Sequence, residues 1–423
     1  MAKSSKQRKA TTRRRRILFV CFADSSHSQS WIDLLATSDF DVRVFAYTLD
    51  TNGRYPPQPW QFPTYVLVKP NEERIAARII SLLPGTRRLR RFVNLASYRF
   101  DLLTRWLAHA IRSWKPDIVH SFSINPAGNL TYQALSRIPK AQRPKWIVSS
   151  WGSDLNLGIH EPEQVQQIEG VLRHCDGFFS DCRRDIRQAL DHGLSPDKVA
   201  IYDGIPVTGG MLPSLVQQSS SLKSSGRKLI IVPKAYEETA NKTLSVLEAL
   251  RMVEEVTVGY EIHLFMCSYD VRIWLRTLPE SLRQRCHCHG TIPNAELVEM
   301  LKRARVMIAP SLSDGTPITM LEAMACGALP LMSPLESIRE WIDDGRNGLL
   351  AHALYPDQLA RALRRALTDD EFCDSAAKIN RQIITERANR NVIRTQALDY
   401  YRHLLSAPSS EPALTTELDA VRG

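Results

Sequence analysis

The chain has 423 residues, a length that suits two domains of roughly 200 residues each better than a single core. With 43% hydrophobic and 24% charged residues, its composition excludes a wholly disordered chain, a collagen-like repeat and a disulfide scaffold. The net charge is +10, but residues 1–16 alone contain eight basic and no acidic side chains. We therefore predict a disordered basic tail over 1–15, attached to a nearly neutral body.

The residues after the tail alternate between short apolar runs and helical patterns. Helical patterns in the first half cover 29–36 and a long region of about 74–114. Short apolar runs predict strands at 17–22, 42–47, 65–68, 117–120, 146–149 and 178–180. Continuous apolar strands separated by helices are typical of a parallel sheet that is covered on both faces.

A second half begins after 207–227, a stretch of small and polar residues that predicts an inter-domain linker. Beyond it, strands are predicted at 228–232, 261–267, 306–309 and 328–332, and helices at 242–252, 296–303, 319–325 and 359–367. The predicted organisation is a first domain over 16–206, a second over 228–385, a closing helix over 386–405 and a disordered tail over 406–423. Two such α/β halves predict a cleft between the domains, where ligands of these folds usually bind.

Cysteine usage and hydropathy indicate a cytoplasmic protein. The eight cysteines lack framework spacing, which suits reduced thiols. The neighbours Cys286-His-Cys-His289 do not predict a metal site, because alternate side chains of a strand point to opposite faces and no second cluster follows at zinc-site spacing. The apolar run 17–23 is too short for a signal peptide, and Asp24 follows it without a cleavage site. No stretch reaches the roughly 18 apolar residues of a membrane span.

The most informative segment is 309–330, APSLSDGTPITMLEAMACGALP. A strand ends at Ala309, a polar loop follows over 311–317, and a helix then begins with Pro317 at an early position. The first N–H groups of a helix are unpaired and lie at the positive end of its dipole, which suits a phosphate. Asp314 lies in the loop and Glu322 about a turn into the helix. Carboxylates accept several hydrogen bonds from sugar hydroxyls, so the layout fits a sugar nucleotide.

This segment resembles the signature of retaining glycosyltransferases of family 4 (glycosyl transferases group 1), in which an acidic residue, seven others and a Glu precede Ala-Met-Ala-x-Gly. Further landmarks of the family resemble Gly290-Thr-Ile-Pro293, Arg339–Leu350, Lys115–His120 and Ser150–Asp154. The resemblance covers most of 16–405; it is strong over 285–350 and weak before 110. It implies the GT-B fold: an α/β protein of two Rossmann-like domains, whose parallel sheets face an inter-domain cleft.

Three departures from the family pattern stand out. Asp314 occupies a position where members usually have Glu; because Asp is one methylene shorter, its reach to the donor sugar could fall short or select a different sugar. The glycine-rich turn after the first strand is replaced by Ala23–Ser28. The His that many members have near the Gly-x-Asp landmark is absent, and Ser150 and Trp151 stand there instead.

The resemblance implies roles for the matching residues. Asp314 and Glu322 are the candidate catalytic residues, with Asp314 on the transferred sugar and Glu322 on the nucleotide ribose. Candidate donor-binding residues, which would stabilise the leaving diphosphate, are Lys234, Lys242, Gly315, Thr316, Pro317, Ile318 and Thr319. Acceptor-side candidates are His27, His120, Trp151, Gly152 and Asp154. The alternatives are a structural role for His120, a simple turn for Gly152 and Asp154, and a solvated Lys242.

A basic stretch lies in the first half. Nine arginines occur between residues 74 and 112, with three acidic residues in or just before this stretch and many apolar residues between them. Such a segment can lie on an anionic membrane surface. The alternative is a pair of core-facing helices with a solvated basic face. The expected location is the cytoplasm, either free or peripheral on the inner face of the membrane.

The function that the resemblance implies is transfer of a sugar from a UDP- or GDP-sugar to a hydroxyl of a sugar, glycan or glycolipid, with retention, in polysaccharide or glycolipid synthesis. It implies no obligatory metal or other cofactor. One alternative is a nucleotide-sugar 2-epimerase, which shares the fold. Another is a non-catalytic protein that binds nucleic acid or a membrane; the near-zero charge of the body argues against nucleic acid.

Overall fold

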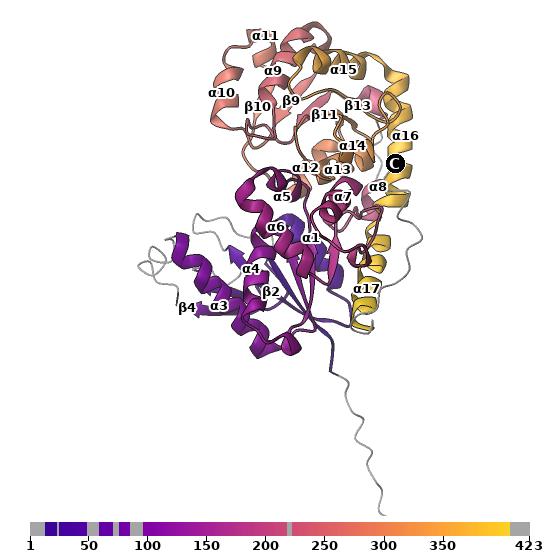
Figure 1. The fold of residues 1–423 in the computed structure, drawn as a ribbon. Coiled ribbons are helices and arrows are strands. Elements are labelled where there is room, and N and C mark those ends of the chain that lie inside the picture. Colours follow the sequence, from indigo (N-terminus) through magenta and orange to yellow (C-terminus); the bar gives the residue numbers. More distant parts are fainter. Residues whose placement is uncertain are drawn as a thin grey trace, which may run out of the picture. The chain divides into compact units, whose positions relative to one another are not determined.

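The computed structural model describes residues 13–22, 25–48, 59–70, 76–84, 96–217 and 222–406. Its packing divides the chain into two compact units. One contains the described residues up to Ser121 together with Leu130–Ile147, and the other contains Phe122–Asn129 and the described residues from Val148 onward. Figure 1 shows the helices and strands of both units in chain order. The predicted tails lie outside the described residues, except for 13–15 and Ser406.

The first half of the chain forms a seven-stranded parallel sheet in the order β4-β3-β2-β1-β5-β6-β7. Its strands are β1 (Arg16–Phe22), β2 (Asp41–Thr48), β3 (Thr64–Val68), β4 (Ile79–Leu83), β5 (Ile118–Phe122), β6 (Lys145–Ser149) and β7 (Gly177–Phe179). The helices between them are α1 (Ser26–Ile32), α3 (Ala96–Trp114), α4 (Asn129–Ser136), α5 (Ser153–Asn156), α6 (Pro162–His174) and α7 (Arg183–Asp191). The central strand β1 is buried from Ile17 to Cys21, as its continuous apolar run predicts.

The prediction of one helical region over 74–114 is wrong at its start. Ile79–Leu83 forms the edge strand β4, which pairs with β3 from Thr64↔Ile79 onward, and only Ala96–Trp114 is described as a helix. A five-residue apolar run has no resolvable period, and Pro84 restricts the residue before it to extended conformations. Five of the nine arginines of the basic stretch lie outside the described residues. The described part of this stretch is therefore a strand and a helix rather than a pair of helices.

The second half forms a six-stranded parallel sheet in the order β10-β9-β8-β11-β12-β13. Its strands are β8 (Leu229–Val232), β9 (Glu261–Leu264), β10 (Cys286–Cys288), β11 (Ala304–Ala309), β12 (Leu329–Met332) and β13 (Leu349–Leu350). The helices are α8 (Pro213–Gln217), α9 (Thr243–Met252), α10 (Tyr269–Leu275), α11 (Glu280–Arg283), α12 (Asn294–Leu301), α13 (Ile318–Cys326), α14 (Glu336–Arg339), α15 (Pro356–Thr368), α16 (Asp370–Arg387) and α17 (Arg390–Ser406). Two parallel sheets with helices between their strands confirm the predicted α/β class.

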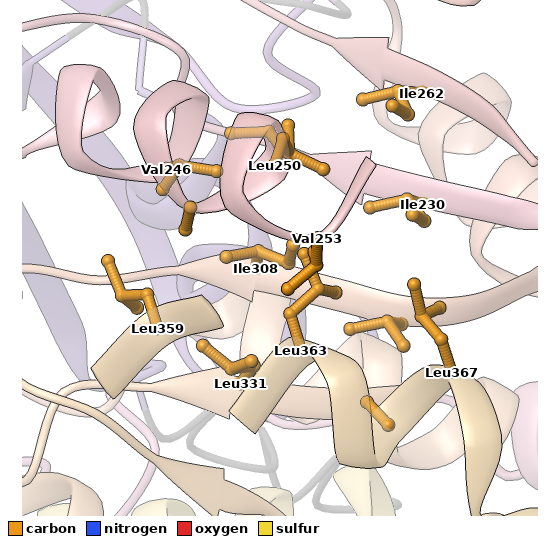
Figure 2. Packing of buried hydrophobic residues seen from close by; sticks show 14 of the residues in the cluster. Ile230, Val246, Leu250, Val253, Ile262, Ile308, Leu331, Leu359, Leu363 and Leu367 are labelled. Carbon is orange, nitrogen blue, oxygen red and sulfur yellow. The ribbon is translucent and has the colours of Figure 1, made fainter. Parts of the chain in front are cut away.

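Both faces of the second sheet are covered by helices. On one face, Figure 2 shows Val246 and Leu250 of α9 and Leu363 of α15 packed over Ile230 and Ile308. The residues next to these on the strands point the other way: Ile231 and Met307 pack with Met320 and Met324 of α13. This alternation is the period of two that a strand imposes on its side chains. The core therefore fixes the position of α13, the helix that contains Glu322.

Helix α17 packs on β7, the last strand of the seven-stranded sheet. Tyr400 and Tyr401 of α17 contact Phe179 of β7, with ring centroids 4.9 Å and 6.2 Å apart. No helix in the described part of the chain is both long and apolar enough to cross a membrane.

Candidate active site

The signature segment has the predicted strand–loop–helix form. β11 ends at Ala309. Helix α13 begins at Ile318, one residue before the predicted range 319–325, and Pro317 is its N-cap residue. The first helical hydrogen bond of this turn runs from the Met320 N–H to the Pro317 carbonyl. The N–H groups of Ile318 and Thr319 therefore precede the helical ladder, at the positive end of the helix dipole. The Thr319 hydroxyl, Oγ1, is buried without a hydrogen-bond partner among the described residues.

Asp314 is paired with a lysine. Its Oδ2 lies 2.8 Å from Nζ of Lys234, which follows strand β8, and its Oδ1 accepts the N–H of Gly315 at 3.0 Å. Burial alone would lower the pKa of Lys234, but the Asp314 carboxylate raises it above its usual value. Lys234 is thus held in its charged form, as a phosphate-binding group requires. Lys242, the N-cap residue of α9, instead donates to the Glu238 carbonyl at 2.6 Å and lies 3.3 Å from Glu237.

The backbone of the loop is held from several sides. The Asp314 carbonyl accepts one hydrogen bond from Nη1 of Arg184 and one from the Ser337 hydroxyl, both at 2.8 Å. Thr316 donates its hydroxyl hydrogen to the Asp181 carbonyl at 2.7 Å and accepts from the Trp341 indole at 3.1 Å. Because these hydrogen bonds hold the loop at the Asp314 carbonyl and at Thr316, the direction of the Asp314 side chain is set before any ligand binds.

Two glycines permit the close approach of neighbouring loops to this segment. Gly315 is packed against Asp181, and a Cβ at 315 would lie 2.6 Å from Asp181 Oδ1. Gly152 has φ +85°, and a Cβ there would overlap the backbone nitrogen of Gly315. Both positions therefore exclude a side chain for steric reasons. The Gly-x-Asp landmark and the signature loop are in direct contact, and Ser153 and Ser313, 160 residues apart in sequence, approach to 3.4 Å.

Glu322 is buried on helix α13. Its side chain is 4% exposed, its Oε1 accepts the Asn294 side-chain amide at 2.8 Å, and its Oε2 has no hydrogen-bond partner among the described residues. Burial raises the pKa of Glu322 to about 7, although the bond from Asn294 acts in the opposite direction. A ligand hydroxyl that donates to Oε2 would satisfy the remaining acceptor.

Three acceptor-side candidates lie in the second unit and form a tight turn: Trp151, Gly152 and Asp154. Asp154 Oδ1 accepts the Trp151 N–H and its Oδ2 accepts the Ile124 N–H, both at 2.7 Å. Burial raises the pKa of Asp154 to about 6, and these two backbone bonds oppose the rise. The Trp151 ring stacks on Phe122 with centroids 6.0 Å apart. Both oxygens of Asp154 are thus engaged by backbone, which is the geometry of the simple-turn alternative.

The two histidine candidates belong to the first unit. His27 lies in α1 and is partly exposed. His120 lies in β5, is fully buried, and contacts the rings of Phe19 and Trp31 with centroids 5.5 Å and 6.3 Å away. Burial lowers the pKa of His120 to about 3, so this histidine is neutral at ordinary pH. These surroundings are those of a structural core histidine.

A buried charged cluster after strand β7 was not anticipated from the sequence. Nη2 of Arg184 lies 2.6 Å from Asp185 Oδ1, and the Ser150 hydroxyl donates to Asp185 Oδ2 at 3.2 Å. Burial raises the pKa of Asp181 well above its usual value, and Asp185 adds to the effect. Asp181, Cys182 and Asp185 are the one group of possible metal ligands found in the part of the chain that the structure describes. The rule that functional groups follow the carboxyl ends of parallel strands would have found this cluster, because Ser180 ends a predicted strand.

Two protein-family models match this chain and together span most of it. The model "Glycosyl transferase 4-like domain" matches residues 26–203, and "Glycosyl transferases group 1" matches residues 217–383. The chain therefore belongs to glycosyltransferase family 4 (glycosyl transferases group 1) and has the GT-B fold.

Among curated relatives, the chain is 28% identical to the putative colanic acid biosynthesis glycosyltransferase WcaL of Salmonella typhimurium, over 48% of this chain and 51% of WcaL. The curated relatives that it matches are covered over 28% to 51% of their own length, so the chain spans at most about half of each.

Solved structures confirm the fold. The sucrose-phosphate synthase of Thermosynechococcus elongatus is similar with a TM-score of 0.70 at 15% identity, over 93% of this chain and all of that one. Alr3699/HepE of Anabaena, in complex with UDP-glucose, is similar with a TM-score of 0.66 at 13% identity, over 92% of this chain and 99% of HepE.

Proposed function

We propose that this protein transfers a sugar from a nucleotide-diphosphate sugar to a hydroxyl group of a glycan or glycolipid, with retention of the anomeric configuration. The observation that supports this best is the arrangement of the signature segment. Asp314, whose carboxylate is paired with the charged Lys234, precedes the first turn of α13. Glu322, which is buried and has an unsatisfied oxygen, follows that turn. The N–H groups between them suit a diphosphate. Donor binding is thus assigned to the predicted second domain, 228–385.

The diphosphate would bind at the start of α13. The positive charge of Lys234 and the N–H groups of Ile318 and Thr319 would stabilise the negative charge that grows on the leaving diphosphate in the transition state. The unpartnered Thr319 hydroxyl offers one further donor there. Lys242 is committed to the Glu238 carbonyl in this structure, so it would need to change partners to bind a phosphate.

Glu322 would bind the nucleotide ribose. Asn294 fixes Oε1, which leaves Oε2 to accept a ribose hydroxyl. Hydrogen bonds from the ribose hydroxyls favour the ionised form of the carboxylate, so ligand binding would lower the pKa of Glu322 from about 7. Asp314 would bind the transferred sugar. Its position is fixed by Lys234 on the side chain and by Arg184 on the carbonyl.

The comparisons support the donor and pathway in outline. HepE binds UDP-glucose, which favours a UDP-sugar as the donor of this chain. The name of WcaL refers to colanic acid synthesis, which favours a polysaccharide or glycolipid acceptor. We further propose that the protein works in the cytoplasm or at the inner face of the membrane, where the basic residues that precede Arg13 would meet anionic lipid, since Arg13, Arg15 and Arg16 contact Asp117. Deleting residues 1–12, which leaves the Arg13 and Arg15 contacts with Asp117 in place, would then reduce membrane association but leave transfer intact.

The direct test replaces Glu322 with Ala and measures donor turnover with acceptor present. We expect a loss of at least about 10²-fold, because a hydrogen bond that orients the donor is removed. Glu248→Ala, in an exposed ion pair with Arg251, is the matched control and should retain full activity. The donor is chosen beforehand from UDP- and GDP-sugars by thermal stabilisation of the purified protein. Undiminished transfer by Glu322→Ala would exclude the proposed role, and conversion of donor without acceptor would indicate an epimerase.

A further inference from the structure

Three of the eight cysteines differ from the others in exposure. All eight lie within the described residues and all are free thiols; Cys267, Cys286 and Cys288 are partly exposed, and the other five are buried. The Sγ atoms of Cys267 and Cys288 lie 3.1 Å apart, with Cys267 as the donor. A disulfide requires about 2.05 Å between the sulfur atoms. The two thiols therefore need to approach each other by only about 1 Å.

The backbone holds this pair together. Strands β9 and β10 are parallel neighbours, with Cys288 opposite Leu264. After β9 the chain turns through Met266 at φ +57°, and the N–H of Cys267 then donates to the His289 carbonyl at 3.2 Å. The N–H of Met266 donates to the Gly290 carbonyl at the same distance. Main-chain bonds on both sides thus place the two cysteines next to each other, independently of the side-chain conformation of either.

The surroundings distinguish the two thiols chemically. By donating its hydrogen to Cys288, the Cys267 thiol holds the pKa of Cys288 below its usual value. Burial opposes this lowering, and the positive charge of Arg272 adds to it. The same hydrogen bond, together with burial, raises the pKa of Cys267. Burial raises the pKa of Cys286 to about 12. Since the thiolate is the reactive form, Cys288 is the nucleophile of this group and Cys286 is comparatively inert.

We propose that Cys267 and Cys288 are a redox modification site, at which a peroxide converts the thiol pair into a disulfide. The Cys288 thiolate attacks one oxygen of the peroxide, the O–O bond breaks, and Cys288 becomes a sulfenic acid while hydroxide leaves and is protonated. The sulfur of Cys267 then attacks the sulfur of Cys288, the S–O bond breaks, and water leaves with the proton of Cys267. Two thiols and one hydrogen peroxide thus yield one disulfide and two waters.

The bridge would lie next to the site described above. Residues 265–268 are tied to the Lys234 loop that follows strand β8: the Ala235 N–H donates to the Phe265 carbonyl at 2.8 Å, and the Ser268 N–H donates to the Ala235 carbonyl at 3.1 Å. Ala235 directly follows Lys234, the partner of Asp314. Disulfide formation itself does not require sugar transfer, so it can be tested without an activity assay.

Peptide mapping tests the bridge directly. The reduced, desalted full-length protein is treated with hydrogen peroxide, its remaining thiols are alkylated, and trypsin is added. Cleavage after Arg251 and Arg272 places Cys267 on peptide 252–272, and cleavage after Arg285 and Lys302 places Cys286 and Cys288 together on peptide 286–302. We expect the two peptides to be joined through Cys267 and Cys288, with Cys286 alkylated. The mass should be about 2 Da below the sum of the two peptides with one alkyl group added, because two hydrogens are lost.

Variants separate the two cysteines that share a peptide. The cross-linked peptides should form in the wild-type protein and in Cys286→Ser. They should be absent from Cys288→Ser and Cys267→Ser. Persistence of the joined peptides in Cys288→Ser would overturn the assignment in favour of Cys286. Conversion of Cys288 to sulfinic acid without a cross-link, or full alkylation of Cys267 and Cys288 after peroxide treatment, would exclude the site. Near-native circular dichroism of each variant shows that the result is not due to unfolding.

Discussion

Asp314 and Glu322 belong to one signature, eight residues apart, but their surroundings differ in kind. Asp314 lies in a loop with a charged partner: Lys234 contacts its carboxylate and Arg184 its carbonyl. Glu322 lies on a helix, 4% exposed, with one amide donor and one unsatisfied oxygen. Burial raises the pKa of Glu322 to about 7. The carboxylate of Asp314 already has a cationic partner within the protein, whereas that of Glu322 is left with one unsatisfied oxygen.

The difference indicates a division of labour between the two carboxylates. A carboxylate that is already paired and held at its backbone is suited to orient a ligand without rearrangement. A buried carboxylate with a free acceptor gains most from a ligand that donates hydrogen bonds to it, because an unmade bond at a buried polar group is costly. Four predictions test this contrast, in order of decreasing effect.

The largest effect is expected from Arg184→Met. This change leaves the buried Asp185 without its cation, so the free energy of unfolding should fall by about 3–5 kcal/mol. Urea denaturation measures the loss. Arg187→Met is the matched control: its pair with Glu336 is exposed, and the loss there should be about 0–1 kcal/mol. Equal losses in both variants would contradict a buried cation behind Asp314. Arg184→Met combined with Asp185→Leu should recover most of the stability.

Next in size is Lys234→Met, which removes the charge beside Asp314. Under the proposed function, kcat should fall by about 10²–10³-fold, because this charge stabilises the leaving diphosphate. Steady-state kinetics with the chosen nucleotide sugar measure the effect. The exposed Lys223 provides the control, and Lys223→Met should leave kcat unchanged. A change confined to KM would assign Lys234 to ground-state binding alone.

The third prediction concerns pH. The folded pKa of Glu322, about 7, exceeds its usual value of 4.5, so the unfolded chain releases this proton first as pH rises. Its contribution to stability is present below about pH 4.5 and is lost by about pH 7, a change of about 3 kcal/mol. Glu322→Gln lacks this loss. Urea denaturation of both proteins at pH 5 and pH 8 isolates the contribution, since Asp154 and Glu340 titrate equally in each. Parallel pH dependence of the two proteins would disprove the raised pKa.

The smallest effect is expected from Asn294→Ala, which removes the one amide that contacts Glu322. At pH 8 the loss in the free energy of unfolding should be about 1.5 kcal/mol, the usual contribution of a hydrogen bond to a charged group. In a Glu322→Ala background the same substitution should cost much less, and the double-mutant cycle measures this difference. Additive losses would show that the two side chains do not interact.

Local patterns were sufficient for much of the fold. Apolar runs such as Ile17–Phe22 and Val306–Ala309 predicted strands because a buried parallel strand needs nothing more than a short apolar stretch. The run Ile79–Leu83 was misassigned because a five-residue run has no measurable period and was absorbed into the neighbouring helix. The alternation of Cys286–His289 was predicted, and the structure confirms it: Cys288 contacts Cys267, and His289 stacks on His263.

By itself, the sequence determined the α/β class, the family and the spacing of Asp314 and Glu322, because these depend on short-range patterns that a strand, a loop and a helix impose on neighbouring residues. Only the tertiary structure decided which side chains meet across long separations. Arg184 lies 130 residues from Asp314, and Lys234 lies 80 residues from it. Such contacts depend on the order of strands in a sheet and on the close approach that Gly152 and Gly315 allow, and no local pattern in the chain encodes either.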